Sequence, residues 1–263
     1  MFISKERANY LKKIRLENFI VTLFRFLIVA IVIGGWEILA RLDLINTFTF
    51  SSPSRIFNTF IELINNGNLF LHIRVTLYET LLSFFLSALI GLGLATLLWS
   101  RPLLSKIVDP YLTVLNSLPK VALGPLIIIW VGASINSIIF MSLLISTFIT
   151  IINIYNGFIS TDKSYITIMK SFGASKWQIF RKVIFPSNYR AIISALKVNI
   201  SMNLIGVIMG ELLVSKEGIG YLIMYGSQVF NIDLVITGVV ILGIVSYLMY
   251  LIISKLENIL RYK

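Results

Sequence analysis

Cysteine is absent from the sequence and histidine occurs once, as His72. Without thiols, the chain can form neither disulfides nor thiolate metal sites. One imidazole builds neither a histidine metal centre nor a histidine proton relay. We therefore expect no metal ligands and no catalytic residue based on cysteine or histidine in this chain.

Charged residues are also scarce, since they make up 13% of the chain where soluble domains carry about 25%. Hydrophobic residues account for 57% of the 263 residues, which is more apolar surface than one soluble core buries. The natural place for the excess is a lipid bilayer. No shift in composition divides the chain, so we expect a cytoplasmic N-terminal segment, residues 1–18, and one membrane domain, residues 19–263. The first apolar run is too long for a cleavable signal peptide, and no small-residue cleavage site follows it.

Long runs without a charged residue mark the segments that cross the membrane. Thr80–Ser100 and Leu234–Ser254 are each long enough for one crossing. Val121–Thr161 is long enough for two, with a polar break at Gly132–Asn136. Two further apolar runs carry charges only near their ends. The sequence therefore predicts an all-α membrane protein with six transmembrane helices, at about 19–40, 77–99, 112–131, 137–156, 192–213 and 233–254.

The positive charges sort to one side of the membrane under this arrangement. If both termini are cytoplasmic, the inner segments hold sixteen basic residues: Lys5, Arg7, Lys12, Lys13, Arg15, Arg101, Lys106, Lys163, Lys170, Lys176, Arg181, Lys182, Arg190, Lys255, Arg261 and Lys263. The outer segments hold four: Arg41, Arg55, Arg74 and Lys216. Because inner loops are enriched in Lys and Arg, this asymmetry places both termini in the cytoplasm. It also accounts for the net charge of +11 without nucleic acid as a partner.

The outer segment between spans 1 and 2 contains a short amphipathic helix. Ser52 and Pro53 form a helix start, and Gly67 supplies a stop. The apolar residues between them share one face, and the run is too short to span a bilayer. The helix is expected either to lie on the membrane surface or to form a rim that helps seat an external partner.

The cytoplasmic segment 162–186, between spans 4 and 5, has the clearest local signals. Asp162 caps a helix over 163–172, and Gly173 supplies its left-handed stop. Ser175 caps a second helix through a capping box with Gln178, and Pro186 is expected to end that helix. The sequence thus predicts a hairpin of two short helices held at the membrane face. The simpler alternative is a basic inner loop that happens to be helical.

This hairpin resembles the "EAA" loop of the permease subunits of binding-protein-dependent ABC importers. Gly173 and Pro186 match the loop's glycine and proline, and Thr167-Ile168-Met169 stands where the family keeps Glu-Ala-Ala. The resemblance implies docking onto a partner ATPase through Thr167, Ile168, Met169, Lys170, Ser171, Phe172, Gly173 and Ala174. It also implies a transport subunit that is no enzyme and binds no cofactor, with ATP and Mg²⁺ held by the partner.

Other motifs resemble the branch of that family that includes sulfonate, taurine and nitrate permeases. They are Phe50–Ser54, Asp109-Pro110, Leu118-Pro119, Pro125-Leu126, Gly210–Leu213 and Glu217–Ile223, within a similarity that covers about residues 30–260. The branch also includes permeases for pyrimidine precursors of thiamine and for riboflavin. The resemblance implies a dimer of ATPase subunits, an external substrate-binding protein that delivers a small solute, and a second permease that is this chain or a paralogue.

Polar residues within the spans point to the translocation path, because surfaces that face lipid are apolar. The candidates are Asn116, Pro119, Lys120, Asn153, Asn199, Asn203 and Glu211. Serine, threonine and asparagine also join helices to one another, so interhelical packing remains the alternative for these polar residues. For Glu211, near the outer end of span 5, a structural brace is the alternative.

Two other functional classes fit the composition less well. A self-sufficient secondary transporter or channel would need charged groups for ion coupling, and mid-span charges are nearly absent. A membrane enzyme would need clustered carboxylates, a His pair or Cys within the spans. The chain also has no phosphate-binding loop of the G-x-x-x-x-G-K-[ST] type, so ATP hydrolysis is assigned to a separate subunit.

Overall fold

The computed structural model describes residues 5–261, with side chains described for residues 13–255, and this range contains helices and no strand. The basic side chains predicted at Lys5, Arg7, Lys12, Arg261 and Lys263 lie outside that description. The elements are α1 (Lys5–Arg41), α2 (Thr47–Phe50), α3 (Pro53–Asn65), α4 (Asn68–Ser100), α5 (Pro102–Ser117), η1 (Lys120–Leu123), α6 (Gly124–Val131), α7 (Ile135–Ile159), α8 (Lys163–Ser171), α9 (Lys176–Ile179), η2 (Phe180–Ile184), α10 (Phe185–Ser187), α11 (Tyr189–Val214), α12 (Ile219–Gln228) and α13 (Ile232–Arg261).

Five helices of the described chain are long and apolar enough to cross a membrane. They are the Lys13–Arg41 part of α1, α4, α7, α11 and the Ile232–Lys255 part of α13. The predicted spans at 19–40, 77–99, 137–156, 192–213 and 233–254 fall within these five helices. The all-helical class and these five apolar spans are therefore confirmed.

The predicted third span, 112–131, is not one straight helix. α5 ends at Ser117, and the chain resumes at Lys120 after a bend of 83°. Leu118 is extended, with φ −61° and ψ 139°, as the residue before a proline prefers. Pro119 also lacks the N–H that would continue α5. The pair of segments makes a sixth crossing only as a broken span.

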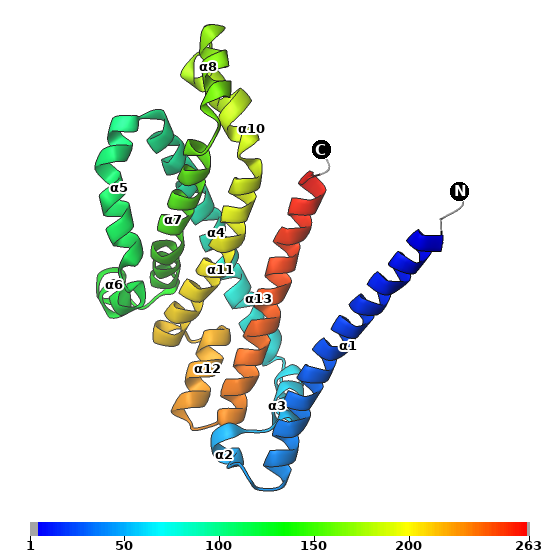
Figure 1. The fold of residues 1–263 in the computed structure, drawn as a ribbon. Coiled ribbons are helices and arrows are strands. Elements are labelled where there is room, and N and C mark those ends of the chain that lie inside the picture. The colour runs from blue at the N-terminus through cyan, green and yellow to red at the C-terminus, as the bar shows by residue number, and fades with distance from the viewer. Residues whose placement is uncertain (1–4, 262–263) are drawn as a thin grey trace.

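The centre of the molecule is a close packing of α4, α7 and α11 (Figure 1). Two glycines let α11 approach the backbone of α7. A Cβ at Gly210 would lie 2.9 Å from the Cα of Ile138, and a Cβ at Gly206 would overlap the Cα of Ser142. Small residues at such positions are how membrane helices come close together.

α13 packs along α11, α12 and α3, whereas α1 leans away from the bundle (Figure 1). The apolar side chains of α1 are largely exposed, and its span window has none buried. A helix of this composition is stable only where lipid or another protein surface covers it.

The amphipathic helix predicted between spans 1 and 2 is confirmed as α3. The Ser52 hydroxyl accepts a hydrogen bond from the N–H of Arg55, Pro53 is the first helical residue, and Gly67 takes φ +70°. Phe60 and Ile64 pack against the cluster that α3 shares with α4, α11, α12 and α13. The predicted apolar face is thus partly covered by the bundle.

Candidate functional site

The hairpin after α7 has the local geometry that its sequence predicts. The Asp162 carboxylate accepts a 2.8 Å hydrogen bond from the N–H of Ser164, which lowers the pKa of that carboxyl. Gly173 takes φ +73° after α8. The Ser175 N–H donates to the Gln178 side chain at 2.7 Å, and the Gln178 N–H donates back to the Ser175 hydroxyl at 3.3 Å. The helix–glycine–helix shape is confirmed.

Pro186 does not end the second helix, which corrects the prediction. The chain passes from α9 through a π-helical turn, η2, into α10, with Pro186 in the first turn of α10. A wider turn accommodates a proline ring that would clash in a regular α-helix. The break comes at Asn188, directly before α11. The second arm of the hairpin is therefore almost continuous with the α11 span.

One face of the hairpin is anchored in the bundle. Phe180 packs edge-on against Phe158 at 5.5 Å and lies 5.3 Å from the ring of Trp99. Ile184 is fully buried beside them. The side chain of Asn188 donates to Thr161 at 2.6 Å and to the Ile184 carbonyl at 2.8 Å, which closes the base of the hairpin.

The other face of the hairpin is free on this chain. Of the predicted docking residues, Met169 and Ala174 are half-buried against the bundle, and the remaining six are exposed: Thr167, Ile168, Lys170, Ser171, Phe172 and Gly173. Phe172 is 83% exposed and Ile168 is 53% exposed. An apolar pair at the tip of a helical projection is suited to a groove on another protein.

Asn199 and Asn203 lie fully buried where α4, α7 and α11 meet. We call their cluster the polar core; its members are Ser87, Ser142, Ser146, Thr150, Asn199 and Asn203. The side-chain oxygen of Asn203 accepts hydrogen bonds from Ser142 at 2.8 Å and from Ser146 at 3.0 Å. The side-chain NH₂ group of Asn203 donates to Ser87 at 2.9 Å. Asn199 donates to Ser87 at 2.9 Å and to Thr150 at 2.5 Å. This geometry favours interhelical packing for both asparagines, and their role in a path stays a prediction.

The remaining path candidates lie elsewhere. At the bend between α5 and η1, the Lys120 ammonium donates to the Asn116 side chain at 3.2 Å and lies 5.6 Å from the centre of the Phe148 ring. Pro119 is exposed at the same bend, and Asn153 is half-buried on α7. The structure therefore brings Asn116, Pro119 and Lys120 together and keeps them apart from the polar core.

Glu211 holds the turn before α12 against α4. It is 1% exposed, and its two oxygens accept from the Thr76 hydroxyl at 2.6 Å and from the Gly220 N–H at 2.5 Å. The Gly218 N–H donates to His72 at 3.0 Å in the same turn. These contacts are those of a structural brace, the alternative that sequence analysis left open for Glu211.

A second buried carboxyl, Glu79 on α4, faces Glu211 at hydrogen-bonding range and is 2% exposed. Sequence analysis misses it, because Glu79 directly precedes a charge-free run and marks the edge of span 2. The available signal is an acidic residue inside the predicted span 77–99, which is costly unless it is paired or functional.

A bundle of apolar helices around a buried polar core, with a basic helical projection at one end, is the architecture of an integral membrane protein. Residues 87–261 match the family model described as "Binding-protein-dependent transport system inner membrane component". The chain belongs to this family, the permease subunits of ABC importers, and is a multi-pass inner-membrane protein.

Two relatives illustrate the branch. The putative aliphatic sulfonates transport permease SsuC of Bacillus subtilis is 29% identical over 88% of this chain and 84% of its own length. The formylaminopyrimidine transport permease ThiX of Halalkalibacterium halodurans is 30% identical over 91% of this chain and 93% of its own length. Relatives of this kind do not favour the alternative of a self-sufficient secondary transporter or channel.

A solved structure supports the fold. A chain of the MetNI methionine ABC transporter, in an inward-facing conformation, superposes with a TM-score of 0.63. The match covers 70% of this chain and 92% of that chain at 22% identity.

Proposed function

We propose that two copies of this chain form the translocation path of an ATP-driven importer, with the hairpin 162–186 as the dock for a dimer of ATPase subunits. The observation that carries this proposal is the hairpin's construction. Its apolar tip is exposed, its base is locked into the bundle, and its second arm leads almost directly into α11. A partner that grips the tip therefore moves a span as a rigid body.

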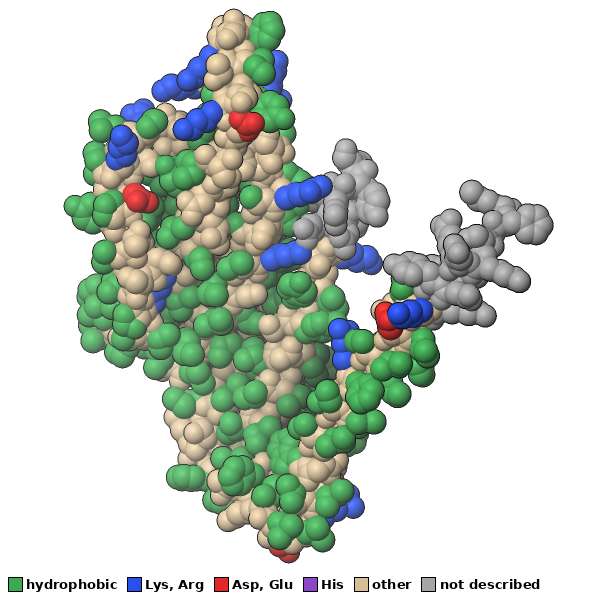
Figure 2. Space-filling view, viewed as in Figure 1, with side chains coloured by type: hydrophobic (Ala, Val, Ile, Leu, Met, Phe, Trp, Pro, Cys, Tyr) green, Lys and Arg blue, Asp and Glu red, His purple; other side chains and the backbone are tan. Residues whose placement is uncertain are grey.

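The proposed orientation places both termini and the hairpin in the cytoplasm. It is supported by the arrangement of the chain, since α8, the start of α1 and the last turn of α13 lie toward one end of the molecule, and α2 and α3 lie toward the other (Figure 1). Lys and Arg side chains gather near the end that carries α8 (Figure 2). Inner surfaces of membrane proteins carry this excess of positive charge.

Within the dimer, we assign the path to the bend between α5 and η1 and to the neighbouring face of α7. Asn116, Pro119, Lys120 and Asn153 are its candidate residues. Pro119 is exposed on a single chain, so this part of the path closes only when a second copy covers it. Asn199, Asn203 and Glu211 then act beside the path by holding α4, α7 and α11 in register.

An external binding protein delivers the solute to the outer end, where α2, α3 and the turn before α12 lie. Two N–H groups of Arg55 donate there to one oxygen of Asp233, at 2.9 and 2.7 Å, and the Ser51 hydroxyl donates to the other oxygen at 2.6 Å. Charge-assisted hydrogen bonds of this kind help to hold a surface in one shape. The cargo falls within the range of the relatives, from sulfonates and taurine to aminopyrimidines.

The test is to purify the permease together with its cognate ATPase and binding protein and to reconstitute them in vesicles. Phe172→Asp is expected to abolish ATPase retention and nucleotide-driven uptake, because it places a charge on the apolar tip. Phe48→Asp is the matched control for ATPase retention, since Phe48 is 63% exposed in α2 at the opposite end. Uptake without ATP by a permease that retains no ATPase would refute the proposal.

A further inference from the structure

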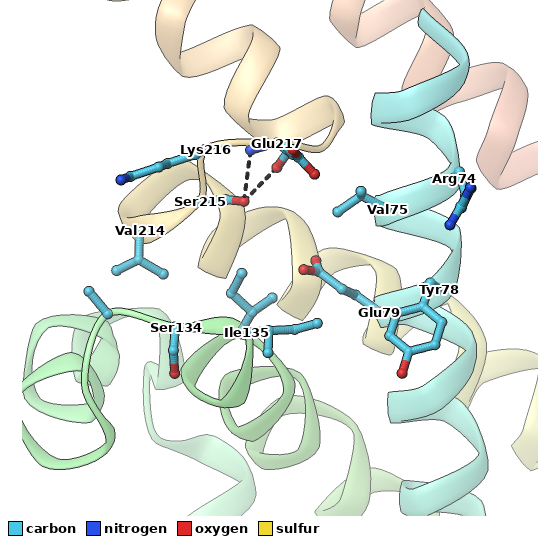
Figure 3. Close-up of a pocket in the computed structure, with 12 residues that line it drawn as sticks. Arg74, Val75, Tyr78, Glu79, Ser134, Ile135, Val214, Ser215, Lys216 and Glu217 are labelled. Carbon is cyan, nitrogen blue, oxygen red and sulfur yellow. Dashed lines mark hydrogen bonds between the residues drawn. The ribbon is translucent and has the colours of Figure 1, made fainter. Parts of the chain in front are cut away.

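Glu79 of α4 and Glu211 of α11 are the acidic residues that the bundle buries, among the side chains that the structure describes. They are 2% and 1% exposed, and their carboxyls lie at hydrogen-bonding range of one another. Figure 3 shows the Glu79 side chain leaving α4 toward the space between Ser215 and Ile135. Two carboxylates this close repel strongly in a poorly solvated place, so the pair needs a positive group between its members.

Lysine and arginine do not supply that positive charge. Among the described side chains, no ion pair joins a Lys or Arg to either carboxyl. Arg74 and Lys216 line the adjacent cavity of about 550 Å³, but both are exposed and point away from Glu79 (Figure 3). Water screens charges in such positions, so these two residues leave the carboxyl pair without a counter-ion.

The other titratable groups around the pair carry no positive charge either. Nδ1 of His72 accepts a 3.0 Å hydrogen bond from the N–H of Gly218, which requires the neutral imidazole. Tyr221 of α12 stacks on His72 at 5.8 Å, and Tyr78 lines the cavity; phenols are uncharged near neutral pH. Glu217 also lines the cavity and has the same sign of charge as the pair.

A metal ion does not fit between the two carboxyls. The turn before α12 closes directly over Glu211, since a Cβ added at Gly218 would overlap the Glu211 carboxyl. Ca²⁺ gathers about 6–8 oxygen ligands and Mg²⁺ keeps several waters, so both need a roomier site with more oxygens. The described residues form no group of three or more His, Cys, Asp or Glu that could hold a metal ion. A proton needs only two facing oxygens.

The hydrogen bonds around the pair place this proton on Glu79. Both oxygens of Glu211 accept, from the Thr76 hydroxyl at 2.6 Å and from the Gly220 N–H at 2.5 Å, and such bonds stabilise a charged carboxylate. No described group donates a hydrogen bond to Oε2 of Glu79. A protonated Glu79 has an O–H group to donate, and the Glu211 carboxylate has lone pairs left to accept it.

We propose that Glu79 and Glu211 form a proton-binding site, in which one proton carried by Glu79 ties α4 to Glu211 and to the turn that Glu211 braces. Water in the cavity that Glu79 lines supplies and removes this proton. Its loss leaves two negative charges face to face, so alkaline conditions loosen the contact between α4 and α11. The site lies within one chain and does not depend on the proposed function.

Infrared spectroscopy of the permease in an ester-free detergent tests the site, because a protonated carboxyl and a carboxylate absorb at different frequencies. We expect the wild type to show a carboxylic-acid band at neutral pH and to lose it in alkaline buffer. Glu79→Gln should lack the band at neutral pH. Glu62→Gln, the same change at an exposed carboxylate of α3, should keep it.

Thermal unfolding distinguishes a bound proton from a merely structural carboxyl. The amide introduced by Glu79→Gln donates an N–H to Glu211 without taking a proton from solution. Wild-type stability should fall as the pH rises, because only the folded state holds the proton in alkaline buffer. Glu79→Gln should therefore match the wild type at neutral pH and unfold several degrees above it in alkaline buffer, whereas Glu62→Gln should follow the wild type at both.

The wild-type spectrum keeps the test decisive if Glu79→Gln does not fold. Absence of a carboxylic-acid band from the wild type at neutral pH would overturn the inference by itself. Equal pH dependence of unfolding in the wild type and Glu79→Gln would also overturn it, and so would a wild-type midpoint that responds to added metal ions and not to pH.

Discussion

At the scale of single residues, the polar core is distinguished by the number of hydrogen bonds that the side chain of Asn203 makes. The side-chain oxygen of Asn203 accepts from two serines on α7, and its amide donates to Ser87 on α4. One fully buried side chain thus connects three spans. Leaving a buried donor or acceptor without a partner costs about 1–3 kcal/mol.

Asn203→Ala is therefore expected to destabilise the permease by about 1–2 kcal/mol, toward the lower end of that range because groups in a membrane find other partners. Thermal unfolding in detergent measures this. Asn156→Ala, at an exposed position of α7, is the control and should leave the midpoint unchanged. If Asn203 instead contacts solute in the path, transport falls while the midpoint stays at its wild-type value.

The glycines of α11 act at the same scale through their lack of a side chain. Gly206→Val would place a branched side chain into the backbone of α7, and overpacking of this kind costs about 1–3 kcal/mol. We expect lower expression and a lower unfolding midpoint. Gly93→Val on α4 is the matched control, because nothing lies within 4 Å of a Cβ added at that position. A Gly206→Val protein of normal stability would contradict the close approach of α11 and α7.

At the scale of elements, the hairpin shows what can be predicted from sequence. The caps at Asp162 and Ser175 and the stop at Gly173 involve groups within a few residues of one another, so local sequence determines them. The prediction that Pro186 ends the second helix is wrong because a π-helical turn accommodates the proline ring. That turn depends on packing against the bundle, which local sequence does not determine. The size of the bend at Pro119 likewise depends on the neighbouring helices.

The same limit applies to the candidate site. Polarity identified Asn199, Asn203 and Glu211 as candidates for the path, but their partners Ser87 and Thr76 come from α4, more than a hundred residues away along the chain. Only the folded structure shows that these contacts are bonds between helices. The importance of Glu79 is likewise visible only in the folded structure, because its neighbour Glu211 lies on α11.

Gly173→Val tests the hairpin as an element. A branched residue at φ +73° is strained by about 1–2 kcal/mol, so α8 should tilt or fray at its end. We expect ATPase activity in the assembled complex to fall severalfold, while unfolding of the permease alone changes little. Gly243→Val, on α13 with open space around it, is the control. Unchanged ATPase coupling in Gly173→Val would show that the angle of the hairpin is not used.

At the scale of the whole molecule, the absence of cysteine provides a direct test of orientation. Ser171→Cys places a thiol on the exposed hairpin, and Asn66→Cys places one after α3 at the other end. We expect a membrane-impermeant maleimide to label only Asn66→Cys in intact cells, and both variants after lysis. Labelling of Ser171→Cys in intact cells would reverse the proposed topology.

α11 begins at the base of the hairpin and ends just after Glu211, so a single helix joins the proposed ATPase dock to the brace near the turn before α12. Its 26 residues span about 39 Å at 1.5 Å per residue. Two ligands that each shift the position of the same helix are thermodynamically linked. If ATPase docking shifts α11 and so changes the affinity of the proposed outer surface for the binding protein, the binding protein must change the affinity of the dock for the ATPase by the same factor.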